Sequence, residues 1–128
     1  MRILGAVVPK KTILVVDDDA ATRVLVHAVL RAHDFVVEDA HSGHDAITRI
    51  SEKRYDAVIL DIMMGDGSGH EVLEVLARQR PDVRCVVVVS ATSAANLEKV
   101  AMANVAAKLR KPFDIDALVQ AVLRCVDQ

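Results

Sequence analysis

Aromatic residues are almost missing from this sequence of 128 residues: there is one Tyr, there are two Phe, and Trp does not occur. Hydrophobic residues still make up 52% of the chain, so the core must be built from Val, Leu, Ile and Ala. The shortage of aromatic rings argues against a surface that stacks the bases of single-stranded nucleic acid. A formal net charge of −2 argues against direct DNA binding, because that affinity depends on clustered Lys and Arg.

Cysteine is also scarce, with Cys85 and Cys125 as the only two. They form no CxxC pair and are too few for a disulfide framework, so we expect reduced thiols in a cytoplasmic protein. No apolar run approaches the length of a membrane span. The apolar start over residues 1–8 is too short for a signal peptide and is broken by a Pro-Lys-Lys sequence. We expect a short N-terminal extension over residues 1–10 and one domain over residues 11–128.

Short apolar runs alternate with longer segments of helical periodicity. The run Ala57–Leu60 ends at Asp61, and the run Thr12–Val16 ends at three consecutive Asp residues. Runs that are apolar on both faces are typical of parallel strands covered by helices on each side. Three further runs fit this pattern, namely Phe35–Glu38, Val83–Val89 and Val105–Leu109. The sequence therefore predicts an α/β fold in which five parallel strands alternate with five helices, a doubly wound (βα)5 arrangement.

Capping residues and apolar periodicity predict the helices between these strands. Capping residues mark three helix starts, namely Ser42 with Asp45, Ser68 with Glu71, and Asp114. The first helix carries an apolar stripe at helical spacing, formed by Ala21, Val24, Leu25, Ala28 and Val29. The fourth helix is weaker and Ala-rich; we expect it over residues 93–103, closed by Asn104 in the left-handed conformation.

Polar side chains gather where the predicted strands end. In a parallel sheet the carboxyl ends of the strands lie at one edge, so Asp17, Asp18 and Asp61 would converge there with Ser90 and Lys111. Carboxylates within about 4–6 Å raise one another's pKa unless a cation relieves them. A few carboxylates with carbonyl and water oxygens are the usual ligands of Mg²⁺. With the metal bound, a carboxylate oxygen can attack a phosphoryl group, and the product is an aspartyl phosphate.

Five motifs carry a resemblance to a known family; they are Ile13–Asp19, Ala40–Ala46, Asp56–Met64, Val88–Ala91 and Lys111–Phe113. In this combination the sequence resembles the response regulator receiver domains of two-component signalling, the CheY-like superfamily. The resemblance covers nearly the whole chain, from about Lys11 to Val126. It implies a flavodoxin-like strand order of 2-1-3-4-5.

The resemblance also implies roles for the residues at the strand ends. Asp61 would be the phosphoacceptor. Mg²⁺, or alternatively Mn²⁺, would be bound by Asp61, by Asp18 directly, by Asp17 chiefly through water, and by the main-chain carbonyl of Met63.

Two further residues match the family pattern. Ser90 stands where a Ser or Thr follows the phosphoryl group. Lys111 stands where a lysine pairs with the phosphate, and its bond to Pro112 is expected to be cis.

By this resemblance the chain is a phosphoacceptor receiver domain that a sensor histidine kinase or a phosphotransfer protein phosphorylates on Asp61. The added charge would bias the surface of the fourth helix, fifth strand and fifth helix between two states and so alter binding to a downstream protein. We expect a monomer or weak dimer that binds neither nucleic acid nor membrane. The alternative is a receiver fragment of a longer regulator with a DNA-binding or enzymatic output domain.

An enzyme is a further alternative. A metal-dependent phosphatase of the haloacid dehalogenase type also uses an Asp nucleophile, but it needs a second Asp two residues later, and Met63 occupies that position. We therefore expect no turnover of external substrates. His41 and His44 have no third ligand near them in sequence, and we interpret them as part of a solvated turn and not as a zinc site.

Three positions depart from the family pattern. Gly65 replaces the usual Pro after the Met-Met pair, which predicts a looser loop behind the acceptor. Asn104 stands where Gly is usual before the fifth strand. Lys108 replaces the Tyr or Phe whose ring normally moves inward with the Ser or Thr, so the usual aromatic switch is not expected here.

Overall fold

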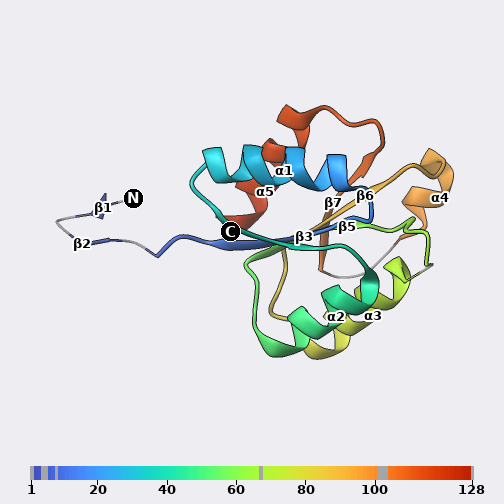
Figure 1. Ribbon diagram of the computed structural model, residues 1–128, viewed down its shortest axis with the longest axis horizontal. Helices are drawn as coiled ribbons and strands as arrows, with labels where there is room; N and C mark the ends of the chain where they lie inside the picture. The colour runs from blue at the N-terminus through green and yellow to red at the C-terminus, as the bar shows by residue number, and fades with distance from the viewer. Residues whose placement is uncertain (1, 4–5, 8, 67, 101–103, 128) are drawn as a thin grey trace.

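A five-stranded parallel sheet, covered by helices on both faces, forms the main body of the chain (Figure 1). The computed structural model describes residues 2–3, 6–7, 9–66, 68–100 and 104–127. The strands are ordered β4-β3-β5-β6-β7, and every neighbouring pair is parallel. Counted along the chain from β3, this is the order 2-1-3-4-5, so the predicted fold is confirmed.

The strands form where the sequence is most apolar. The interior strands are β3 (Thr12–Val16), β5 (Ala57–Asp61) and β6 (Val86–Ser90), and every residue of β5 and β6 is buried. The edge strands β4 (Val36–Ala40) and β7 (Val105–Arg110) are only partly buried. Apart from Thr12, Asp61 and Ser90 at their ends, the interior strands are apolar, as expected of strands whose two faces are both covered by helices.

The helices divide into two layers. In Figure 1, α1 (Ala20–Ala32) and α5 (Ile115–Val126) lie above the sheet, and α2 (Gly43–Glu52) and α3 (Gly69–Gln79) lie below it. The short α4 (Ala94–Glu98) lies beyond the carboxyl ends of the strands. Each layer encloses its own hydrophobic cluster. The upper one includes Val26, Leu30, Leu118 and Val122, and the lower one includes Ile50, Leu73 and Leu76.

Two of the three predicted helix caps are present. Ser42 and Asp114 each accept a backbone N–H from the first turn of the following helix, at α2 and α5, and Asp19 does the same at α1. The capping box predicted at α3 is wrong. The side chain of Ser68 makes no cap hydrogen bond, because its hydroxyl donates to Asp66 in the preceding turn.

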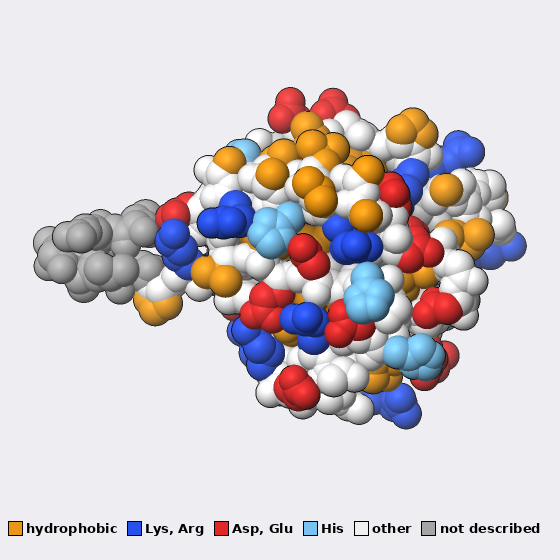
Figure 2. Space-filling model, viewed as in Figure 1, with side chains coloured by type: hydrophobic (Ala, Val, Ile, Leu, Met, Phe, Trp, Pro, Cys, Tyr) orange, Lys and Arg blue, Asp and Glu red, His pale blue; other side chains and the backbone are white. Residues whose placement is uncertain are grey.

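The apolar stripe of α1 does not face the sheet, as a stripe of this kind usually does. The side chains that enter the core are Val26 and Leu30, whereas Val24 and Leu25 are 69% and 54% exposed. Figure 2 shows hydrophobic side chains gathered over this helix. Two apolar sets overlap in this helix, and periodicity alone cannot decide which of them packs on the sheet. The exposed set leaves an apolar face beside the carboxyl ends of the strands.

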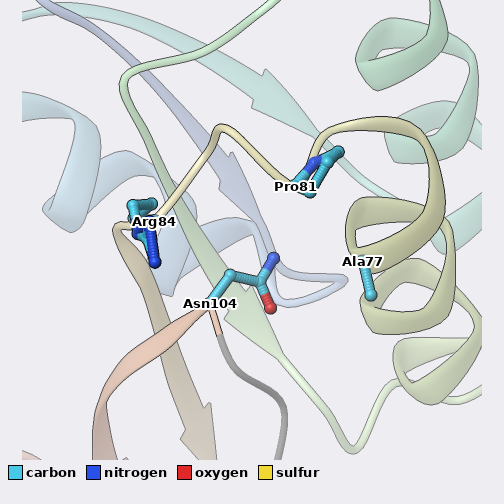
Figure 3. A pocket seen from close by; sticks show the side chains of 4 residues that line it. All are labelled: Ala77, Pro81, Arg84 and Asn104. Carbon is cyan, nitrogen blue, oxygen red and sulfur yellow. The ribbon is translucent and has the colours of Figure 1, made fainter.

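The predicted fourth helix is longer than the helix observed. α4 ends at Glu98, and residues 101–103 of the prediction lie outside the described residues. Asn104 does not adopt a left-handed conformation, so the predicted closure of the helix is wrong. Its side chain is buried and makes no hydrogen bond to any part of the chain that the structure describes. It lines a cavity of about 80 Å³ with Ala77, Pro81 and Arg84 (Figure 3).

The two cysteines are joined, which corrects the expectation of reduced thiols. Cys85 lies directly before β6, and Cys125 lies in the last turn of α5. They form a disulfide with a Cα–Cα distance of 5.4 Å, within the usual range for such bonds. Their separation of 40 residues hides this pairing from the sequence, because it depends on how α5 packs against the sheet. Cys85 is buried in the core beneath α5.

The N-terminal segment before the main sheet contains two short strands. β1 (Arg2–Ile3) and β2 (Ala6–Val7) pair with each other in an antiparallel two-stranded sheet separate from the main one (Figure 1). Within the described ranges, no helix is both long enough and apolar enough to cross a membrane.

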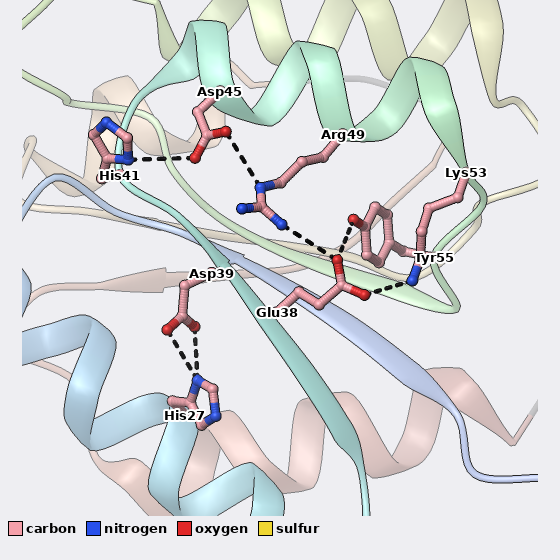
Figure 4. Close-up of polar contacts among 8 residues, drawn as sticks. All are labelled: His27, Glu38, Asp39, His41, Asp45, Arg49, Lys53 and Tyr55. Atoms are coloured by element: carbon pink, nitrogen blue, oxygen red, sulfur yellow. Dashed lines mark hydrogen bonds and ion pairs between the residues drawn. The ribbon is translucent and has the colours of Figure 1, made fainter.

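Tyr55, the only tyrosine, anchors a polar network between α2 and the edge strand β4 (Figure 4). Its ring is buried, and its hydroxyl donates to Glu38 Oε1 at 2.8 Å. Glu38 also binds the ammonium of Lys53 and the guanidinium of Arg49. Burial and the hydrogen bond to the Glu38 carboxylate raise the pKa of Tyr55 to about 12. The network holds the loop before β5 against the edge of the sheet.

This network predicts how the protein responds to alkali. Because the folded pKa of Tyr55 lies above its ordinary value of about 10, the contribution of Tyr55 to stability is complete below pH ~10 and is lost as the pH rises toward 12. The chain has no Trp, so the ultraviolet absorbance of tyrosinate reports Tyr55 alone. We expect a midpoint near 12 in the folded protein. In urea it should return to about 10. A folded-state midpoint at the urea value, with circular dichroism still native, would contradict the assignment.

Candidate functional site

Three residues from three strand ends meet at the carboxyl edge of the sheet. Asp17 follows β3, Asp61 is the last residue of β5, and Lys111 follows β7. Lys111 Nζ lies 2.8 Å from Asp17 Oδ2 and 3.0 Å from Asp61 Oδ2. The Lys111–Pro112 peptide bond is cis, as expected. Parallel strands bring residues 94 and 50 positions apart in the chain into direct contact here.

Burial decides the electrostatics of this group. Asp17 and Asp61 are almost fully buried. Burial raises the pKa of Asp17, although hydrogen bonds from Lys111 and from the backbone of Asp19 favour its charged form. Burial also opposes the charge of Lys111, but its hydrogen bonds to Asp17 and Asp61 outweigh this effect and raise the pKa of its ammonium group. Lys111 is therefore charged at neutral pH and pairs with both carboxylates.

A third carboxylate completes the acidic group. Asp17, Asp18 and Asp61 each offer an oxygen, and these oxygens all lie within 4.8 Å of one another. Three carboxylates face the single ammonium of Lys111, so a divalent cation would offset the remaining charge. An all-oxygen donor set with one exposed member, Asp18, also leaves room for the water ligands that Mg²⁺ retains. The residues present therefore fit this metal.

The loop after β5 holds two of these carboxylates through its backbone. The amide of Met63 donates to Asp61 Oδ1 at 2.9 Å, and the amide of Gly65 donates to Asp18 Oδ2 at 2.8 Å. The side chain of Met63 points outward and is 58% exposed. A Pro at position 65 would lack the N–H that reaches Asp18. The hydrogen bond from Gly65 to Asp18 is therefore possible only because Gly replaces the usual Pro at position 65.

Ser90 is the last residue of β6, at the same edge of the sheet. The residue is completely buried, and its hydroxyl accepts a hydrogen bond from the amide of Thr92 at 3.1 Å. Its carbonyl accepts the amide of Lys111 at 2.7 Å. Because Asp61 pairs with Val89 in the sheet register, Ser90 lies one residue beyond the neighbour of Asp61.

Other candidate residues lie apart from this group. Lys108 is exposed on β7, and its Nζ donates to the carbonyl of Glu98 in α4 at 3.1 Å. His41 contacts Asp45 at 3.3 Å through Nδ1 (Figure 4). This contact belongs to the surface of α2 and not to a metal site. His27 is partly buried, and its Nδ1 atom lies 2.9 Å from Asp39 Oδ1.

Sequence reasoning missed one cation at the site. The Nη1 atom of Arg23 donates to the main-chain carbonyl of Asp17 at 2.7 Å. Arg23 lies one helical turn after the capping residue Asp19 and so faces back toward the end of β3. The sequence signal for this contact was a basic residue in the first turn of the helix that follows three consecutive Asp residues.

The family model for the response regulator receiver domain matches residues 13–123. The chain belongs to this family. The Salmonella typhimurium transcriptional regulatory protein ZraR is 31% identical to this receiver domain over 113 residues, which are 88% of this chain and 26% of ZraR. Across the curated relatives it matches, the chain spans from about 26% to 60% of their length.

Solved structures share the fold of this receiver domain. A CheY-like response regulator receiver domain protein from Methanospirillum hungatei JF-1 superposes with a TM-score of 0.85 at 26% identity, covering 93% of this chain and 95% of that one. The response regulator TrrA of Thermotoga maritima, solved in complex with Mg²⁺–BeF, gives 0.80 at 28% identity, covering 90% and 98%.

The backbone of Gly69 lies against the backbone of Ile62, at the start of the loop that carries Met63 and Gly65, and this close contact predicts an effect on stability. A Cβ at Gly69 would overlap the backbone carbonyl of Ile62, which neither residue can relieve without moving the loop. We expect Gly69→Ala to lower the free energy of unfolding by about 1–3 kcal/mol, measured by urea denaturation. The matched control is Gly65→Ala, whose Cβ would meet only Asp18 Oδ2 at 3.4 Å and should leave stability nearly unchanged. Equal losses in the two variants would show that the close contact at Gly69 is not the cause.

Proposed function

We propose that this receiver domain accepts a phosphoryl group on Asp61 from a histidine kinase or a phosphotransfer protein, and that the modified form binds its target differently. The observation that carries the proposal is the double contact of Lys111 with Asp17 and Asp61. It supports a site in which one carboxylate attacks while a fixed ammonium pairs with the incoming phosphoryl oxygens.

The chemistry follows from the contacts of Asp61. A carboxylate oxygen of Asp61 attacks phosphorus, the P–N bond of the donor phosphohistidine breaks, and the imidazole leaves with its electron pair. The Met63 amide and the Lys111 ammonium hold the carboxylate in place and oppose the negative charge that gathers on the phosphoryl group. Bound Mg²⁺ would supply further neutralisation of that charge, held by Asp17, Asp18 and Asp61.

The domain would act only on its own carboxylate. The position two residues after Asp61, where an aspartate phosphatase places its acid/base, is occupied by the outward-facing Met63. This supports a phosphorylated signalling module and argues against turnover of external substrates.

Labelling experiments test the acceptor. With acetyl phosphate and Mg²⁺, intact mass spectrometry should show the addition of one phosphoryl group, and a chelator should prevent it. Asp61→Asn should abolish labelling because the nucleophile is lost. Asp82→Asn, which changes an exposed carboxylate elsewhere on the surface, is the matched control and should be labelled normally. Unchanged labelling of Asp61→Asn would place the acceptor at another residue.

The exposed face of α1 is the proposed docking surface for the phosphodonor protein. Leu25 lines an apolar cavity of about 430 Å³ that reaches Lys111, Pro112, Phe113 and Ile115. The apolar surface therefore ends at the lysine that would meet the phosphoryl group. Side chains this exposed are a place where a partner helix can bury its own apolar face.

If the phosphodonor protein docks on this surface, a change there should slow transfer from the protein donor but not from a small-molecule donor. Leu25→Ser should slow phosphoryl transfer from a phosphorylated phosphotransfer protein by about tenfold, since burying a leucine contributes about 1.5–3 kcal/mol. Labelling by acetyl phosphate should not change. Val36→Ser is the matched control, because Val36 is also exposed but lies on the edge strand β4 away from this cavity. A rate loss with both kinds of donor would mean that Leu25 supports the site itself.

The phosphorylated state can be passed either to a separate partner protein or to an output domain in the same polypeptide. Lys108, in place of the usual aromatic residue, ties β7 to the end of α4 through Glu98. We propose that this α4–β7–α5 surface transmits the phosphorylated state without an inward-moving ring. The length of ZraR and its name as a transcriptional regulator favour the second candidate, a receiver that controls an output domain in the same polypeptide. Immunoblotting the native protein separates the two: a band at 13.9 kDa supports a separate partner, and a band of higher mass supports an attached domain.

A further inference from the structure

The Cys85–Cys125 disulfide lies at the end of the molecule opposite Asp61. Cys85 precedes the amino end of β6, whereas Asp61 ends the neighbouring strand β5. A five-residue strand, about 16 Å long at about 3.3 Å per residue, separates the two edges of the sheet. The bond connects the last turn of α5 to the central sheet. It is therefore independent of the acidic group and its chemistry.

The disulfide is open to solvent on one side. Cys85 is buried, but Cys125 is only partly buried. Both line a surface cavity of about 130 Å³, together with Lys11, Arg54, Asp56, Asp82, Arg84 and Val126. A small molecule that enters this cavity can therefore approach the sulfur of Cys125.

The charges around this cavity favour an anion. Arg54 is paired with both acidic residues of the lining, at 3.1 Å from Asp56 Oδ1 and 2.8 Å from Asp82 Oδ2. Lys11 and Arg84 form no ion pair within the ranges that the structure describes. The lining thus carries three cations and two carboxylates, a net charge of +1, and two of its cations are not held in an ion pair by any described residue. Such a lining raises the local concentration of negatively charged molecules.

We propose that the Cys85–Cys125 disulfide is a thiol–disulfide exchange site selective for small anionic thiols. A thiolate attacks the Sγ atom of Cys125, the S–S bond breaks, and Cys85 leaves as a thiolate that takes up a proton. A second thiolate attacks the mixed disulfide on Cys125, which releases the small-molecule disulfide and the Cys125 thiol. Overall, two small thiols are oxidised and the protein disulfide is reduced to two thiols.

Exchange at this position would change the attachment of α5 to the sheet. The disulfide is the covalent link between the end of α5 and the start of β6, 40 residues apart in the chain. When it opens, the last turn of α5 loses its covalent link to the sheet and keeps its non-covalent contacts, including the packing of the buried Val126. Because α5 belongs to the proposed output surface, the redox state of this bond would act on the same helix from the opposite end of the sheet.

Thiols of different charge test the proposal on the oxidised full chain. The probes are anionic 2-mercaptoethanesulfonate, neutral 2-mercaptoethanol and cationic cysteamine, with rates of disulfide reduction normalised to thiolate concentration. We expect the anionic thiol to react about tenfold faster than the neutral one at low salt, and cysteamine to react most slowly. The difference should shrink at high ionic strength, where surface charges are screened.

Variants show whether the cavity is responsible. Lys11→Gln and Arg84→Gln should each reduce the preference for the anionic thiol, and the double variant should remove it. Lys99→Gln is the matched control, because it removes an exposed lysine at the end of α4, outside the cavity lining. Equal rates for the three thiols, or two free thiols per chain after treatment with an oxidant, would overturn the proposal. Asp61→Asn should be reduced at the wild-type rate, so failure of the phosphoacceptor assignment would leave this result unaffected.

Discussion

The ammonium of Lys111, bound between the carboxylates of Asp17 and Asp61, is the interaction on which the functional end of this molecule depends. Two buried carboxylates side by side repel each other and lose hydration, and neither is stable there without a cation. Lys111 supplies one positive charge at a fixed position, because the amide of the same residue is bound to the carbonyl of Ser90. The remaining negative charge, extended by Asp18, is what suits the edge of the sheet to a divalent ion.

The sheet separates two kinds of chemistry at its two ends. The carboxyl ends of the strands carry the acidic group, and the amino ends carry the disulfide and its basic cavity. Parallel pairing keeps the two groups apart, because it places all strand ends of one kind at one edge. α5 connects the two kinds of chemistry, with Asp114 capping it near Lys111 and Cys125 close to its other end.

The sequence was sufficient where a feature depends on one segment or on parallel order. The apolar runs predicted the strands, and parallel order predicted that Asp17, Asp61 and Lys111 lie at one edge. It was insufficient where the outcome depends on how elements pack. Both apolar sets of α1 fit a helical period, and only the packing of the helix selects Leu30 over Leu25. The pairing of the two cysteines requires α5 to lie against β6, which no local pattern records.

Backbone contacts were the other feature that side-chain patterns could not show. A glycine in place of proline indicated a looser loop, but the freed amide of Gly65 binds Asp18. Likewise, the sequence shows that Lys108 replaces the usual aromatic residue. Its hydrogen bond to the carbonyl of Glu98 could not be predicted, because it depends on where α4 ends.

The contact between Lys111 and Asp17 joins positions 94 residues apart. Because a polypeptide is made from its amino end, the strand bearing the first of these residues leaves the ribosome long before the lysine is synthesised. A nascent chain therefore cannot place this ammonium between the two carboxylates until its final strand has been added to the sheet. A chain that ends before Lys111 would leave Asp17 and Asp61 side by side without the cation that binds them both.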